Sequence, residues 1–273
     1  MSLEELVRLT VLGTGTARPV GDTAASGLLI QSATTNVLFD CGSGIAAQLE
    51  GAVGAERLHG LVVGHFHADH WIDLAPLRYR FPWGERAPHR LPVHLPPGGR
   101  DKLEHLAAAI SERPGFFDDA FEVREYASGD VLEIGDIRVT PIPVGHYVPA
   151  WAMNVVAADG SRIVYAGDMG PSDAIVELAR ASDLLILEAT LESAAFDDLR
   201  RGHLTAEEAI DHAIRAGVPR ALLVHYPSER RADIAARCAA SGAPVAPAFV
   251  GQVVDVTRAR AGGAGASRAA ARG

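Results

Sequence analysis

The sequence has 273 residues, of which 48% are hydrophobic and 22% charged, enough to bury a core as one large α/β domain or two small ones. Its formal net charge of −9 argues against a general nucleic-acid-binding protein, and its two cysteines, Cys41 and Cys238, imply no disulfide framework. The acidic start of the chain lacks the apolar core of a secretory signal, and no run of about 18 apolar residues could span a membrane. We therefore expect a soluble, cytoplasmic protein.

The first predicted strand covers residues 7–12 and ends in a glycine-containing turn. Gly13-Thr14-Gly15 would suit a dinucleotide-binding loop, but the third glycine position holds Arg18, Pro19 follows, and no helical period begins. A tight turn, in which the glycines let the backbone pass close to the functional site, explains the stretch better.

Residues 27–30 and 36–39 are predicted to pair as strands, and the second strand ends in Asp40. A carboxylate at the end of an apolar strand is costly unless it is paired. Asp40 would either orient a ligand histidine from behind or cap a turn, and the sequence leaves both readings open. Helical spacing follows over roughly 45–49.

The densest chemical signal is His65-Phe66-His67-Ala68-Asp69-His70, directly after the apolar run 61–64. Histidine is the commonest metal ligand, and imidazole with carboxylate suits zinc, manganese, iron or nickel. A solvated histidine-rich loop is the simpler alternative. However, packing gives no reason for three imidazoles and a carboxylate so close together, so we predict a metal site.

Basic and aromatic side chains alternate after the histidine motif. Arg78, Arg80 and Trp83 could receive an anionic or ring-bearing substrate. A surface loop or a dimer contact explains the same residues more simply. A strand over 91–95 and a helix from about 101 to 110 follow.

The second half of the chain alternates strands and helices. Hairpins are predicted over 131–144 and 152–166, then a helix over about 172–180 and a buried strand over 183–187. A capping box at 205–208 predicts a helix to 216 that Gly217 stops. A strand over 221–224 and a helix around 233–240 complete the pattern.

Five apolar strands lead into a polar side chain: His65, His146, Asp168, Glu188 and His225. Buried strands with polar residues only at their carboxyl ends place those residues along one rim of a layered sheet. This convergence predicts one composite site and favours a single domain over 1–258. The Gly/Ala/Arg-rich tail, 259–273, is expected to be disordered.

These motifs resemble those of the metallo-β-lactamase-fold hydrolases. The resemblance rests on H-x-H-x-D-H at 65–70, His146, the Gly-Asp pair at 167–168, and His225. The stretches Leu-Gly-Thr-Gly at 12–15, Leu-Glu-Ala-Thr at 187–190 and Gly-His-Leu-Thr at 202–205 are similar to the branch with ribonuclease Z and the atypical class II cyclic-nucleotide phosphodiesterases. The resemblance covers about residues 7–250 and implies an α/β fold, a four-layer αββα sandwich.

The resemblance also implies two divalent metal ions, with zinc expected and manganese, iron or nickel as alternatives. Their ligands would be His65, His67 and His146 for the first ion, Asp69, His70 and His225 for the second, and Asp168 as the bridge. A hydroxide bridging the ions would attack the substrate. Asp69 would also orient this hydroxide. Two ions about 3.5–4 Å apart can ionise a water and neutralise both the attacking and leaving oxygens of a phosphoryl centre.

Glu188 and His203 gain a catalytic role within this resemblance. A carboxylate that ends a buried strand can orient an imidazole and keep it protonated, and His203 lies just before a helix start, where an anion would bind. As an imidazolium, His203 could steady a phosphate oxygen or protonate the leaving alkoxide. The alternative is that the pair only braces the fold. The remaining histidines are expected to be ordinary: His59, His89, His94, His105 and His212.

The leading hypothesis is a binuclear metal phosphodiesterase that acts on a small or cyclic phosphodiester. Ribonuclease Z typically carries a long arm for transfer RNA between the third histidine and the bridging aspartate. Here a plain hairpin fills that interval of 22 positions, from 146 to 168, which argues against transfer-RNA processing. Hydrolysis of a lactone, thioester or sulfate ester is the alternative, followed by a metal-stabilised binding module. The expected partner is a small molecule rather than a nucleic acid or a membrane, and a homodimer is compatible with the sequence.

Overall fold

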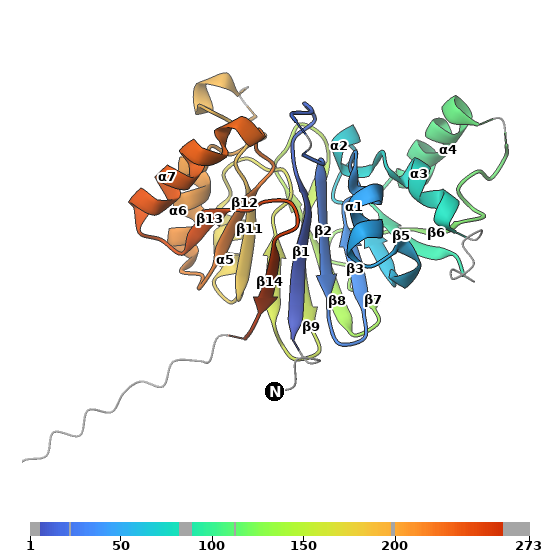
Figure 1. Ribbon diagram of the computed structural model, residues 1–273, viewed down its shortest axis with the longest axis horizontal. Helices are drawn as coiled ribbons and strands as arrows, with labels where there is room; N and C mark the ends of the chain where they lie inside the picture. Colours follow the sequence, from blue (N-terminus) through green and yellow to red (C-terminus); the bar gives the residue numbers. More distant parts are fainter. Residues whose placement is uncertain (1–5, 22, 82–88, 112, 198–199, 259–273) are drawn as a thin grey trace, which may run out of the picture.

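The protein has two β-sheets packed face to face, with helices on both outer sides (Figure 1). This computed structural model describes residues 6–21, 23–81, 89–111, 113–197 and 200–258. Trp83 and the predicted tail at 259–273 lie outside the described residues. Within the described part, no helix is long and apolar enough to cross a membrane.

The first sheet is antiparallel on one side and parallel on the other. Its order is β14 (Val253–Val256), β1 (Val7–Thr14), β2 (Ser26–Gln31), β3 (Asn36–Phe39), β4 (Gly60–Val62), β5 (Leu91–Leu95) and β6 (Phe121–Glu125). Pairing is antiparallel from β14 to β3 and parallel from β3 to β6.

The second sheet repeats this plan. Its order is β13 (Val245–Pro247), β12 (Ala221–Val224), β11 (Leu184–Glu188), β10 (Arg162–Tyr165), β9 (Ala150–Ala157), β8 (Ile137–Val144) and β7 (Leu132–Ile134). Pairing is antiparallel from β7 to β10 and parallel from β10 to β13. The parallel halves therefore bring several strand carboxyl ends to one edge of each sheet.

The helices cover the outer faces, four on the first sheet and three on the second. They are α1 (Ile45–Ala52), α2 (Ala68–Trp71), α3 (Leu74–Leu77) and α4 (Gly99–Ile110), then α5 (Asp173–Ala179), α6 (Ala206–Ala216) and α7 (Arg231–Ser241). Short 3-10 turns are η2 (Ala55–Arg57), η3 (Arg78–Arg80), η4 (Ala194–Phe196) and η5 (Ser228–Arg230).

Strand periodicity explains the layering. Leu28 and Ile30 of β2 pack in the core between the sheets, whereas Leu29 packs outward against the helices. In β11, Leu184 packs between the sheets and Leu185 packs outward. Strands with apolar residues on both faces must be covered on both sides. The predicted αββα sandwich is confirmed.

Most predicted elements are present, with shifted ends. The α6 helix has the predicted capping box, and its Gly217 adopts φ 65°. Helix α4 begins two residues earlier than predicted, at Gly99. Strands β6, β13 and β14 were not predicted. Gly13 lies inside β1 rather than in a turn, and a Cβ there would lie 1.8 Å from the carbonyl oxygen of Ala25, so glycine is needed for the close approach of these two segments.

Candidate metal centre

The predicted site residues converge where the carboxyl ends of the two sheets meet. The short helix α2 lies at this edge, at the top of Figure 1. Two backbone hydrogen bonds join the sheets there: Trp151 donates to the carbonyl of Gly64 at 3.1 Å, and Tyr226 donates to the carbonyl of Thr14 at 3.0 Å. The centre is therefore built across the interface between the sheets.

A first group of possible ligand atoms contains three histidine nitrogens. His67 Nδ1 lies 3.1 Å from His65 Nε2 and 3.0 Å from His146 Nε2. Ligands around a tetrahedral zinc ion, at about 2.0–2.1 Å each, are about 3.3 Å apart. Asp168 completes the group, and its four ligand atoms lie within 4.8 Å of one another. The donor set and the spacing fit a divalent metal ion.

A second group lies beside the first. His225 Nε2 lies 3.0 Å from Asp69 Oδ2, and His70 Nε2 lies 3.8 Å from the same oxygen. Asp168 Oδ2 lies 3.4 Å from both of these nitrogens and 3.8 Å from His65 Nε2. Asp168 thus touches both groups. This is the position that the resemblance assigned to the bridging carboxylate.

Burial prepares the first group of histidines for metal binding. Loss of solvation lowers the pKa of His67, lowers the pKa of His65 well below its usual range, and brings the pKa of His146 to about 4. These imidazoles are therefore neutral at pH 7. A histidine must be neutral to bind a metal ion. A metal ion that binds to this group therefore does not have to displace protons from the three imidazoles.

The second group carries more negative charge. Burial alone would raise the pKa of Asp168, but His225 and His70 lower it well below its usual range. Burial likewise opposes protonation of His70, but Asp168 and Asp40 raise the pKa of His70 well above its usual range. Buried carboxylates beside an imidazole thus require a positive charge, which a proton or a metal ion can supply.

Partners behind the ligands fix the imidazole tautomers. His70 Nδ1 donates to Asp40 Oδ2 at 2.8 Å, and His146 Nδ1 donates to the carbonyl of Gly202 at 2.6 Å. When the imidazole is neutral, each of these hydrogen bonds leaves the lone pair on Nε2, which faces the cluster. Asp40 also accepts hydrogen bonds from Gly64 N and Tyr165 Oη, both at 2.7 Å. Asp40 therefore lies behind a histidine, and the amide that it accepts from, Gly64 N, follows a different strand, β4, rather than the turn after Asp40.

Two residues of the centre have left-handed backbone conformations. Asp40 has φ 59° and His225 has φ 49°, a region that residues other than glycine rarely adopt. Each directly follows an apolar strand, β3 or β12. Such conformations cost of order 1–3 kcal/mol and persist where surrounding contacts over-determine them. Here the left-handed backbone conformation turns the side chains of Asp40 and His225 toward the cluster.

A buried carboxylate, Glu188, and a partly buried imidazole, His203, form a pair against the cluster. His203 Nδ1 lies 2.8 Å and 3.0 Å from the two carboxylate oxygens of Glu188, and 3.9 Å from Asp168 Oδ2. Met169 N donates to Glu188 at 2.7 Å. Burial lowers the pKa of His203, but the hydrogen bond and charge of Glu188 outweigh it and raise the pKa to about 9. His203 is therefore a cation at neutral pH.

Three further residues support the centre. The Thr190 hydroxyl donates to Glu188 and lies 2.8 Å from His225 Nδ1, linking two strand ends. Tyr147 donates to Asp197, which accepts from the backbone N–H of His203 at 3.3 Å. Sequence reasoning assigned no role to these residues. Thr190 could have been found within the Leu-Glu-Ala-Thr stretch, whereas Tyr147 and Asp197 meet only through the fold.

The expected arginine site is not at the cluster. Arg78 is buried, with its guanidinium 4.0 Å from the Phe116 ring and 3.8 Å from Asp119. Arg80 pairs with Glu50 at 2.9 Å and with Glu56. Packing and acidic partners hold both arginines in these positions, and a substrate contact at Arg78 or Arg80 stays a prediction.

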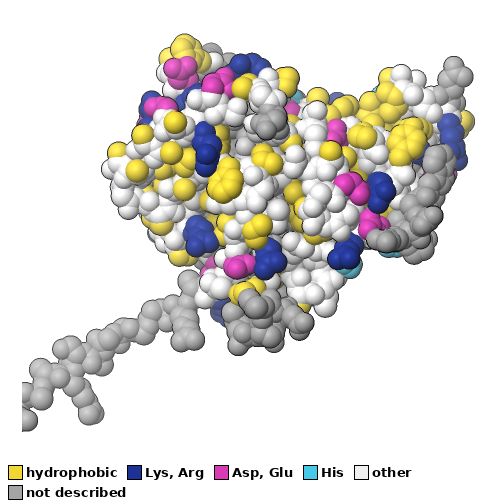
Figure 2. Space-filling model, in the orientation of Figure 1, with side chains coloured by type: hydrophobic (Ala, Val, Ile, Leu, Met, Phe, Trp, Pro, Cys, Tyr) yellow, Lys and Arg dark blue, Asp and Glu magenta, His cyan; other side chains and the backbone are white. Residues whose placement is uncertain are grey.

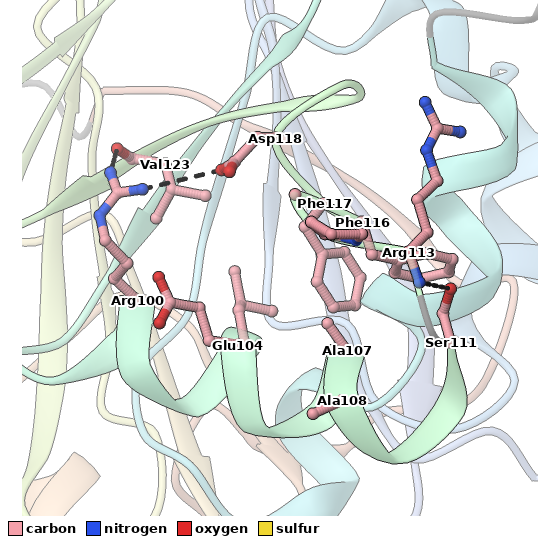
Figure 3. Close-up of a pocket in the computed structure, with 13 residues that line it drawn as sticks. Arg100, Glu104, Ala107, Ala108, Ser111, Arg113, Phe116, Phe117, Asp118 and Val123 are labelled. Carbon is pink, nitrogen blue, oxygen red and sulfur yellow. Dashed lines mark hydrogen bonds and ion pairs between the residues drawn. The ribbon is translucent and has the colours of Figure 1, made fainter.

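Phe116 also lines a separate cavity. Figure 3 shows this space between α4 and the segment 113–118, with Phe116 and Phe117 opposite Ala107. Its volume is about 420 Å³, and its lining contains no member of the metal cluster. The cavity is therefore distinct from the candidate centre.

Comparisons with known proteins agree with this geometry. Residues 35–226 match a family model described as a "Beta-lactamase superfamily domain". The probable metallo-hydrolase YhfI of Bacillus subtilis is 30% identical, over 81% of this chain and 87% of YhfI. Ribonuclease Z of Halorubrum lacusprofundi is also 30% identical, over 83% and 88% of the two chains.

Solved structures share the fold of this chain. The crystal structure of YhfI superposes with a TM-score of 0.79 at 27% identity, covering 92% of this chain and 99% of YhfI. The short form of human tRNase Z (ELAC1) has a TM-score of 0.72 at 24% identity, covering 92% and 99%. The latter likeness concerns the fold alone. The resemblance predicted from the motifs is confirmed.

Proposed function

We propose that this chain, a metallo-hydrolase of the β-lactamase superfamily, uses two divalent metal ions to hydrolyse small or cyclic phosphodiesters. The observation that carries the proposal is the Glu188–His203 pair, which holds an imidazolium 3.9 Å from the shared carboxylate Asp168. A fixed positive charge of this kind favours a reaction in which negative charge develops on several oxygens.

Seven residues would hold the ions. His65, His67 and His146 would bind the first, Asp69, His70 and His225 the second, and Asp168 both. When bound, such a pair supplies an ionised water at neutral pH and positive charge at the phosphoryl oxygens. Zinc is the expected metal, with manganese, iron and nickel as alternatives, because these donors accept all of them.

The chain's own residues would orient the reactants. Asp69 lies at the cluster with its carboxylate held 3.0 Å from His225 Nε2, and it would orient the attacking water. As an imidazolium, His203 donates a hydrogen bond from its Nδ1–H to Glu188 and carries a second proton at Nε2. From there it would steady a phosphoryl oxygen and then protonate the leaving alkoxide. Glu188 would fix this orientation without touching the substrate.

A small substrate suits this chain better than transfer RNA. The interval between His146 and Asp168 contains only β9 and β10, joined by a turn at Asp159-Gly160. On the face shown in Figure 2, lysine and arginine side chains are scattered among acidic ones and form no continuous basic field. A phosphate backbone is bound through such a field.

Replacing His203 tests the proposal. His203→Ala should lower the turnover of bis(4-nitrophenyl) phosphate and cyclic nucleotides by about 10²–10⁴-fold, the usual contribution of a positioned proton donor, while metal content stays at the wild-type value. His105→Ala, at an exposed position on α4, is the matched control. Unchanged turnover in His203→Ala would remove the assigned role.

The same metal-quantified protein should be assayed with 2′,3′- and 3′,5′-cyclic nucleotides, precursor transfer RNA, a lactone, a thioester and a sulfate ester. Preference for a phosphodiester supports the proposal. Preference for a non-phosphate ester overturns it, as does activity that survives removal of the metal by a chelator.

A further inference from the structure

A small pocket opens beside the candidate metal centre. Its volume is about 180 Å³. It is lined by the β1–β2 loop, the segment after β3 and helix α2, through Thr16, Ala17, Pro19, Thr23, Ala25, Ser43, Ala68, Asp69 and Ile72. Figure 1 places the β1–β2 loop at the same end of the molecule as α2. Asp69 belongs both to the pocket lining and to the cluster, so a group bound in the pocket would lie next to one residue of the candidate centre.

The backbone holds this wall in place. Gly15 N donates to the carbonyl of Ala24 at 2.9 Å, and Ala25 N donates to the carbonyl of Ser43 at 2.9 Å. A Cβ on Gly42 would lie 1.8 Å from the carbonyl oxygen of Asp69, so only glycine lets these segments approach so closely. The loop is thereby fixed against the residues that carry Asp69.

The lining has a definite chemical character. Three of the nine lining residues, Thr16, Thr23 and Ser43, carry hydroxyl groups, and five are apolar. Asp69 is the only charged residue among the lining residues, and no lysine or arginine is among them. Hydroxyl groups both donate and accept hydrogen bonds, so this lining suits a neutral group that carries hydroxyls. It does not suit a second phosphate.

The volume limits the size of that group. A water molecule takes about 30 Å³ in the liquid, so the pocket holds the equivalent of about six waters. Pockets for drug-sized ligands measure about 300–1,000 Å³. The pocket therefore has room for a short polyol or a single sugar ring, and not for a whole nucleoside.

We propose that this pocket binds the ester arm of the substrate that stays on the phosphate, and that it selects a short, uncharged arm bearing hydroxyls, of polyol or sugar type. The inference rests on the proposed phosphodiester function. It adds a substrate class to that function: diesters in which one arm is a small hydroxylated group.

The test compares 4-nitrophenyl phosphodiesters whose second arm is methyl, propyl or glyceryl. The wild-type, metal-loaded protein should prefer glyceryl over propyl. Thr23→Val removes one hydroxyl at constant shape and should reduce this preference by about five-fold. Ala17→Leu narrows the pocket and should lower the ratio of glyceryl to methyl turnover by about ten-fold. Ala33→Leu, in the turn between β2 and β3, is the matched control and should change neither ratio.

A binding measurement separates failure of the pocket from failure of the chemistry. Titration calorimetry with glycerol phosphate and propyl phosphate should give tighter binding of glycerol phosphate to the wild type, and a smaller difference in Thr23→Val. If no diester is hydrolysed, the proposed function fails, and this titration alone decides the pocket. Equal affinities, or ratios that neither substitution alters, overturn the pocket assignment.

Discussion

The two halves of the candidate centre are built in different ways. The first sheet supplies His65, His67, Asp69 and His70 from one loop and short helix after β4. The second sheet supplies His146, Asp168 and His225, each after the end of a different strand. His225 lies 156 positions away in sequence from Asp69, to which it is hydrogen-bonded. One half depends on local backbone geometry, and the other depends on the packing of a whole sheet.

This difference predicts which half of the centre tolerates the loss of one ligand better. A loop that carries four ligands keeps three of them in place when one is lost. A ligand at a strand end has no local substitute, and its loss also removes a contact between the sheets. Substitutions in the distributed half should therefore have wider effects than substitutions in the local half.

Asp168→Asn should produce the largest effect. The side chain keeps its shape but loses the charge that faces His65, His70 and His225. We expect a loss of more than about 10³-fold in turnover, at the upper end for a single charge-stabilising group, together with reduced content of both metals. Asp255→Asn, at an exposed position, is the control. Two bound metals and near-normal turnover in Asp168→Asn would contradict the bridging position.

The residues behind the ligands give a more direct comparison. Asp40 lies behind His70 and accepts three hydrogen bonds, whereas Thr190 lies behind His225 and is neutral. Asp40→Asn should weaken metal binding by about 10–100-fold, because it also leaves a donor facing a donor. Thr190→Val should weaken it by only about five-fold. Metal titration against a chelator measures both, and equal losses would contradict the ranking.

The smallest effect on activity is expected at His94, outside the centre. Burial, followed by the charge of Arg124, lowers the pKa of His94 to about 4. The unfolded imidazole, with its ordinary pKa near 6.5, binds a proton first as the pH falls. His94 therefore lowers the free energy of unfolding by about 2–3 kcal/mol as the pH falls from 6.5 to 4.

His94→Gln should remove that part of the pH dependence and leave activity at pH 7.5 unchanged. Urea unfolding of metal-free wild type and variant at pH 7 and pH 4.5 measures the difference. Parallel pH dependences in the two proteins would show that His94 does not titrate in this way.

The sequence predicted the centre better than it predicted the sheet edges. Polar residues after apolar strands are visible without a fold, because hydrophobic runs and their breaks lie in the sequence. The edge strands β6 and β14 are short, and β14 alternates buried and exposed residues over only four positions. Such segments become strands through their partners, and those partners are not apparent from local sequence.

Long-range contacts explain the remaining errors. A surface loop was the simpler prediction for Arg78, but the structure buries Arg78 against the ring of Phe116, which comes from a distant segment. Asp197 has no recognisable pattern around it and gains its position from Tyr147 and the His203 backbone. The sequence shows the chemical type of each side chain. Which residues a side chain contacts is set only when the two sheets and their helices pack together.

The pairing of β1 with β14 sets the order in which this molecule can be assembled on the ribosome. Val7 pairs with Val256, so the first strand to be synthesised waits for one of the last. At about 5–20 residues per second, that edge of β1 stays open for at least about ten seconds, and an open strand edge is a site where chains associate wrongly. Slower synthesis therefore lengthens the time for which the β1 edge is open to wrong pairing.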